Sequence, residues 1–132
     1  MQSAKPQAAH TNSSAAGRGL LAERLLALAA AAIGLTSQLS RTVAGRYISG
    51  QLMRACASAG ANYEEACGAE SRADFVHKMQ IVLKELREAR FWLRLLERSK
   101  LGPAQSVSEL REEASGLARM TAKSVVTAKS GR

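Results

Sequence analysis

The chain has 132 residues, the length of one domain, and a hydrophobic content of 46% argues against bulk disorder. Aromatic residues make up only 4%, whereas the strong helix formers Ala, Leu, Arg and Glu are abundant, so the composition favours an all-α fold. The formal net charge is +8, of which residues 1–18 and 119–132 carry +6, leaving the middle of the chain nearly neutral. A charge placed at the ends does not by itself indicate a nucleic-acid or membrane partner.

The first 17 residues are small, polar and without periodicity, which predicts a flexible N-terminal tail over residues 1–17. They contain no apolar segment of the kind that a signal peptide needs. Leucines then recur at helical spacing and predict a first helix from about Gly19 to Leu39. The uncharged run Leu25–Ser40 has 16 residues, fewer than the about 20 that a membrane span requires. We therefore expect a helix of the protein core, no membrane contact and a cytoplasmic protein.

A second helix is predicted from about Arg46 to Ala66, with Ile48, Leu52 and other apolar residues on one stripe. The two cysteines, Cys56 and Cys67, are both expected near or on this helix. Eleven residues of helix span roughly 16 Å, which is too long for a disulfide between them. The sequence predicts two free thiols in a reducing compartment, with an intermolecular disulfide or a reactive thiol as the alternative.

The third and fourth helices have marked starting points. Ser71–Asp74 is a capping box that begins a helix reaching about Ser99, and Ser106–Glu109 is a second capping box for the last helix. Four helices joined by short connections run antiparallel to their neighbours. The sequence therefore predicts an all-α, antiparallel up-down-up-down four-helix bundle over residues 18–128, followed by a basic C-terminal end, 129–132.

The third helix carries cations along one side. On a helical projection, five basic residues fall within roughly 120°, and no acidic residue lies inside that arc. A solvated face is one interpretation, with Glu88 and Glu97 close enough to neutralise some of the charge; an anion-binding surface is the other. The candidate nucleic-acid-binding residues are Lys84, Arg87, Arg90, Arg94 and Arg98.

A second apolar sector follows the same helix. It lies beside the basic arc and is separate from the core face, so it exceeds what the helix needs to bury within its own chain. Exposed Phe and Trp side chains typically mark a partner surface, and self-association is the interpretation we favour over deep burial inside one chain. The candidate oligomer-interface residues are Ile81, Phe91, Trp92 and Leu95.

The sequence shows no P-loop, zinc-protease, Cys-x-x-Cys or nucleophile-elbow motif. Asp74 and His77 share one face of the third helix, but a di-metal bundle site needs such a pair on two helices together with two further glutamates. Asp74 also has a role in the capping box. We therefore expect no enzyme, no catalytic, metal-ligating or cofactor-binding residue, and no cofactor.

Several segments resemble one family of bacterial proteins. The most specific are Gly60–Ala66 (GANYEEA) and Ala69–Phe75 (AESRADF), and these are accompanied by Gly45–Ile48, Gln51–Arg54, Leu83–Glu88 and Trp92–Leu93. Their order is similar to that in the four-helix-bundle family encoded in intervening sequences of bacterial 23S ribosomal RNA genes. The resemblance covers about residues 18–128.

This resemblance implies a ring-like homopentamer. It also implies a relative, the accessory protein of diversity-generating retroelements, which partners a reverse transcriptase and binds nucleic acid through a basic surface. Taken with the residues, it leads us to expect a non-enzymatic homo-oligomer that binds the backbone of RNA or DNA. The alternative is a protein–protein interaction scaffold with no nucleic-acid role.

Overall fold

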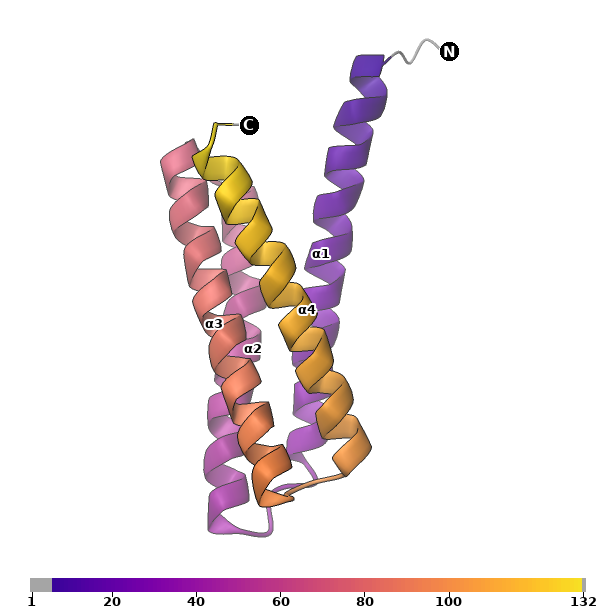
Figure 1. Cartoon of the computed structure of the whole chain (residues 1–132), viewed down its shortest axis with the longest axis vertical. Coiled ribbons are helices and arrows are strands. Elements are labelled where there is room, and N and C mark those ends of the chain that lie inside the picture. The colour runs from indigo at the N-terminus through magenta and orange to yellow at the C-terminus, as the bar shows by residue number, and fades with distance from the viewer. Residues whose placement is uncertain (1–5, 132) are drawn as a thin grey trace.

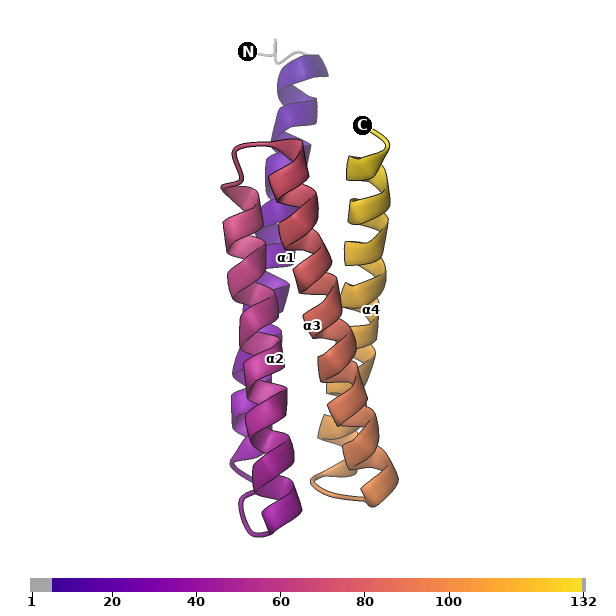
Figure 2. The same ribbon diagram turned by 90° about the vertical axis from the view of Figure 1, so that its left-hand side faces the viewer.

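The computed structural model describes residues 6–131, and side chains from residue 16 onward. It contains four helices: α1 (Pro6–Thr36), α2 (Val43–Cys67), α3 (Arg72–Ser99) and α4 (Ala104–Lys129). Each helix runs antiparallel to the next, and α1 extends past the end of the bundle (Figures 1 and 2). The described part of the chain contains no strand. The predicted all-α four-helix bundle is confirmed.

Three helices, α1, α2 and α4, begin earlier than predicted, and α1 ends at Thr36 instead of near Leu39. α1 begins at Pro6 instead of near Gly19, so residues 6–17 of the predicted tail form its first turns, while residues 1–5 lie outside the described residues. Proline suits the first helical position, and Ala-rich sequence propagates a helix well. α2 begins at Val43 because the Thr42 side chain accepts a hydrogen bond from the Gly45 amide at 2.9 Å.

The predicted capping box at the start of α4 is wrong. The helix begins at Ala104, and Pro103 is the N-cap residue without a side-chain hydrogen bond. Gly102 has φ 81°, which turns the chain early enough for the Pro103 carbonyl to accept the first helical bond from Val107. The capping box of α3 is present, with the Ser71 hydroxyl accepting from the Asp74 amide at 3.1 Å.

Leucines from all four helices form the core. Its largest fully buried side chains include Leu25, Leu28, Leu52, Met79, Leu86, Leu93, Leu96 and Leu117. α2 packs closely on α3 and α3 on α4, whereas α1 packs mainly on α2 and less on α4. α3 is therefore flanked on both sides, and only its outer face remains open to solvent.

α1 keeps a second apolar face outside the core. Its exposed residues include Leu20, Leu26 and Ile33, whereas Leu21, Leu25 and Leu28 point into the bundle. Among the described residues, Ala16–Thr36 is the single segment that is long and apolar enough to cross a membrane. That observation is weak, because core helices and signal sequences have the same length and composition.

Candidate functional site

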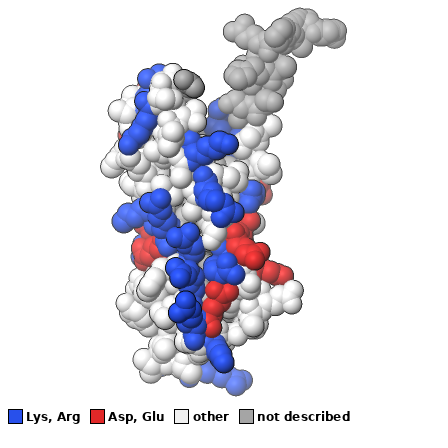
Figure 3. Space-filling view, viewed as in Figure 1, with Lys and Arg blue, Asp and Glu red and all other residues white. Residues whose placement is uncertain are grey.

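The five cations predicted on α3 lie along its outer face. Lys84, Arg87, Arg94 and Arg98 are exposed, and Arg90 is half-buried toward α4. We call these five residues the α3 cation stripe. Figure 3 shows Lys and Arg side chains running down the middle of this face, with acidic side chains on both flanks. Within the described residues, none of the five forms a salt bridge.

The acidic residues on the α2 side of the stripe are bound to an arginine of α2. The Arg54 guanidinium lies 3.2 Å from a Glu85 oxygen and also pairs with Glu88. Glu85 is only 6% exposed and accepts a further hydrogen bond from the Ser58 hydroxyl at 3.3 Å. The ion-pair partner of Glu88 therefore comes from α2, while Lys84 of the stripe interacts with Glu88 more weakly.

The acidic residue on the α4 side is held in the same way. Glu97 accepts a hydrogen bond from Arg111 Nε of α4 at 2.8 Å, instead of pairing with a cation of the stripe. The pair lies in a groove between α3 and α4 with a volume of about 460 Å³. The groove is lined by Arg90, Arg94, Glu97, Arg98, Arg111 and Ser115. Four guanidinium groups and one carboxylate leave this groove strongly positive, which suits a phosphate group.

The ion pairs also keep the bordering groups charged. The hydrogen bond from Arg54 lowers the pKa of Glu88 below its ordinary value, with smaller contributions in the same direction from Trp92 and Lys84. The same hydrogen bond raises the pKa of Arg54. Glu88 is therefore ionised at neutral pH, and Arg54 offsets its charge.

The predicted apolar sector divides into a buried and an exposed half. Ile81 and Trp92 are half-buried, whereas Phe91 is 55% and Leu95 is 37% exposed. The Trp92 ring meets Phe91 edge to face, with ring centroids 5.0 Å apart, and meets Tyr47 of α2 in the same way at 5.8 Å. Trp92 Nε1 donates to Glu88 at 3.1 Å.

Sequence reasoning missed three residues that shape this site: Tyr47, Arg54 and Arg111. Each lies on a helix other than α3 and reaches the site through interhelical contacts. Arg54 and Arg111 each lie eight positions from the nearest other basic residue of the same helix, so they form no cationic stripe that the sequence reveals. Their partners follow from the relative register of neighbouring helices, which a single sequence does not contain.

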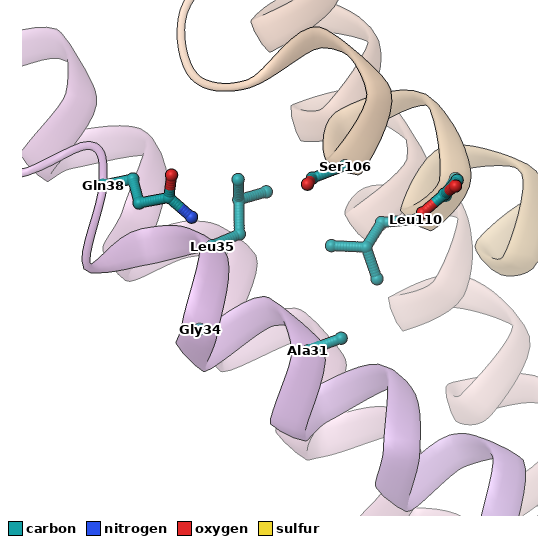
Figure 4. A pocket seen from close by; sticks show the side chains of 7 residues that line it. Ala31, Gly34, Leu35, Gln38, Ser106 and Leu110 are labelled. Atoms are coloured by element: carbon teal, nitrogen blue, oxygen red, sulfur yellow. The ribbon is translucent and has the colours of Figure 1, made fainter.

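The described part of the chain contains no group of three or more His, Cys, Asp or Glu side chains that could hold a metal ion. His77 is exposed on α3. A cavity of about 390 Å³ lies between α1 and α4, where Leu35 and Leu110 project toward one another (Figure 4). Its one titratable side chain is Glu109, which accepts a hydrogen bond from Gln105.

The fold and the surface charge define a small four-helix-bundle protein with a row of cations along the outer face of α3. Residues 22–123 match the family model described as 23S rRNA-intervening sequence protein, and the chain belongs to this family. This confirms the family resemblance on which the sequence interpretation drew.

A solved structure agrees with this assignment. It is a protein of unknown function from the S23 ribosomal protein family of Bacteroides thetaiotaomicron, with a TM-score of 0.72 and 28% sequence identity. The match covers 80% of this chain and 97% of that protein. No curated protein matches this chain. The comparisons identify the family and the fold, and neither match names a reaction.

Proposed function

We propose that this chain is a non-enzymatic, cytoplasmic, homo-oligomeric protein that binds RNA or DNA mainly through the phosphate backbone. One observation carries the proposal. The five members of the α3 cation stripe share one helix face without a salt bridge among the described residues, while Arg54 and Arg111 occupy the carboxylates on either side. Like charges at this spacing repel one another, and a polyanion relieves that repulsion. Phosphates along a nucleic-acid strand are such a polyanion.

Backbone contact fits the shape of this surface better than base-specific reading. The stripe runs along the outer face of a helix packed between two others, whereas a recognition helix contacts base edges with its N-terminal residues. Long basic side chains on a gently curved face reach phosphates without a requirement for sequence. We therefore expect binding that depends strongly on salt and weakly on sequence.

Self-association strengthens weak contacts of this kind. The family resemblance implies five copies, and a pentamer has a formal charge of 5 × 8 = +40. Repeated stripes raise the effective concentration of each contact once the first is made. The outer face of α1, where Leu26 and Ile33 are exposed, is an apolar surface available for subunit contacts.

Titration of a labelled RNA and a labelled DNA strand with purified protein at two salt concentrations tests the proposal. The mass of the protein in solution is measured alongside. We expect an oligomer whose affinity falls steeply with salt, and an Arg90→Glu/Arg94→Glu variant that binds much more weakly. The matched control is Arg41→Glu/Lys129→Glu, at two exposed positions outside α3. Each pair of substitutions lowers the net charge by four, from +8 to +4.

The control distinguishes an effect of the stripe residues from an effect of net charge. Equal losses in both variants would mean that net charge alone drives binding, and unchanged binding in the Arg90→Glu/Arg94→Glu variant would remove the stripe from the site. No binding at low salt would instead favour the second candidate function, a protein–protein interaction scaffold. The exposed rings of Tyr47 and Phe91 are the observation that supports this scaffold, whose partner would be a reverse transcriptase or another protein.

A further inference from the structure

Phe91 lies midway along the α3 cation stripe, at the edge that borders the exposed Leu95. On a helix, residues three or four positions apart are neighbours on the same face, which places Arg87 and Arg94 directly beside Phe91. Lys84 and Arg98 follow one turn further along in each direction. Phe91 is 55% exposed, so a large apolar ring lies open to solvent between four cations.

The acidic neighbour of the ring is bound to residues outside the stripe. Glu88 lies three positions before Phe91, but it pairs with Arg54 and accepts the Trp92 indole hydrogen bond. The cations around Phe91 form no salt bridge within the described residues. The surface around the ring is therefore apolar at its centre and positive along its length.

The orientation of the ring is held by its neighbours. Trp92 packs edge to face against Phe91 at 5.0 Å and against Tyr47 at 5.8 Å, with interplanar angles of 75° and 80°. Trp92 is itself packed against the core and bound to Glu88. A ring that is already positioned loses little conformational entropy when it contacts a ligand.

A second copy of this surface is a poor occupant. A symmetric contact through Phe91 would bring Arg87 and Arg94 of two chains together, and their repulsion opposes the apolar contact. An unpaired strand of nucleic acid offers both features that the surface calls for, since its phosphates meet the cations and its bases present flat faces to the ring. In a duplex those faces are covered by stacking, so a duplex reaches the cations alone.

We infer that Phe91 is a stacking platform for an unpaired base, and that the α3 cation stripe takes single-stranded RNA or DNA in preference to duplex. This inference rests on the proposed function. Stacking of one base on an aromatic side chain contributes a factor of roughly 5 to 150 in affinity. The preference for a single strand comes from the ring, whereas the cations bind both forms.

The test compares Phe91→Ala with the unchanged protein on labelled oligo(U), labelled oligo(dT) and a duplex of the same length. We expect affinity for both single strands to fall about fivefold or more, and affinity for the duplex to stay the same. Phe91→Tyr keeps an aromatic face and should bind the single strands as the unchanged protein does. Phe91→Leu keeps apolar bulk without an aromatic face and should bind them as weakly as Phe91→Ala. Val126→Ala, at a position on α4 that is 67% exposed, is the matched control for loss of apolar surface.

Two further measurements separate stacking from other uses of the ring. Trp92 is the single tryptophan of the chain and touches Phe91, so oligo(dT) should quench its fluorescence more strongly than the duplex does. The mass of the Phe91→Ala variant should equal that of the unchanged protein. A dissociated Phe91→Ala variant would overturn the inference and make the ring a subunit contact.

The remaining outcomes distinguish this inference from the proposed function. If nucleic acid binds but Phe91→Ala lowers the affinities for single strand and duplex equally, or lowers neither affinity, the stacking platform is wrong and the basic surface stands. If the unchanged protein binds no nucleic acid at low salt, both are wrong. Weaker oligo(U) binding with unchanged oligo(dT) binding would also overturn the inference, because a base-stacking contact is shared by RNA and DNA.

Discussion

Glu97 on α3 accepts a hydrogen bond from Arg111 on α4, with Nε and Oε1 2.8 Å apart. Both side chains are close to 30% exposed, and they lie in the groove between Arg90, Arg94 and Arg98. This ion pair affects the charge of the groove, because Glu97 would otherwise be free to pair with a cation of the stripe. The arginine of α4 thus keeps the surface of α3 positive.

The Glu97→Gln substitution should therefore strengthen nucleic-acid binding. Removing the carboxylate raises the net charge of the groove by one, and we expect affinity at low salt to rise about two- to fivefold. The free energy of unfolding should change by less than about 1 kcal/mol, since partly exposed ion pairs contribute little. Titration with a labelled strand and urea unfolding measure the two effects. Glu64→Gln, at an exposed position on α2, is the control with the same charge change. An equal gain in both variants would show that the groove is not the binding surface.

We expect Arg54 to stabilise the fold because it forms an ion pair with the buried carboxylate of Glu85. Arg54→Met would leave Glu85, 6% exposed, with the Ser58 hydroxyl as its remaining hydrogen-bond partner in the described part of the chain. We expect a loss of about 1–3 kcal/mol in the free energy of unfolding at pH 7, measured by urea titration. Arg87→Met, which removes an exposed cation that has no salt bridge, should stay within about 0.5 kcal/mol of the unchanged protein. Similar losses in the two variants would contradict a supporting role for Arg54.

The same arginine should make stability depend on acid pH. The pKa of Glu88 is lowered from its ordinary 4.5, chiefly by the hydrogen bond from Arg54. A carboxyl group whose pKa is lower in the folded state stabilises the fold above its unfolded pKa, and this contribution is lost as pH falls through the folded pKa. Urea midpoints measured from about pH 6 down to pH 3 should fall less in Arg54→Met than in the unchanged protein. Parallel curves for the two proteins would exclude the pair as a source of acid sensitivity.

Much of this arrangement was predictable from one sequence. The spacing of Val82, Leu86, Leu93 and Leu96 places them on one face of α3, and all four are fully buried. The position of the α3 cation stripe on an outer face follows from the same projection. These features depend on one helix at a time, and the 3.6-residue period determines them.

Features that join two helices were not predictable in this way. The pairing of Glu88 with Arg54 and of Glu97 with Arg111 depends on how far α2 and α4 are shifted along α3. The contact between Tyr47 and Trp92 has the same origin. Periodicity identifies the face of a helix, whereas the register between helices follows from packing of the whole core.

Gly45 should be the least replaceable glycine of the bundle. A Cβ atom added there would lie 2.0 Å from the Leu39 carbonyl oxygen and 2.9 Å from the Thr42 hydroxyl, so the start of α2 would have to move. We expect Gly45→Ala to lower the free energy of unfolding by about 1–3 kcal/mol. Gly50→Ala is the matched control in the same helix, where an added Cβ meets nothing within 4 Å. It should raise the free energy of unfolding by about 0.5–1 kcal/mol. Thermal melting of both variants measures the contrast, and a shift of the same sign in both would contradict the predicted close approach.

The two cysteines should differ sharply in reactivity. Cys56 is 1% exposed in the core, and burial raises the pKa of its thiol to about 12, so very little thiolate is present at neutral pH. Cys67 is exposed at the end of α2. A maleimide at pH 7 should therefore label one thiol per chain quickly, and the second should react only when urea unfolds the bundle. The Cys67→Ser variant identifies the fast site, because it should show no rapid labelling in the folded state. Rapid labelling of that variant would mean that the α2 core opens readily, since a thiol inside a closed bundle is reached by the reagent only through unfolding.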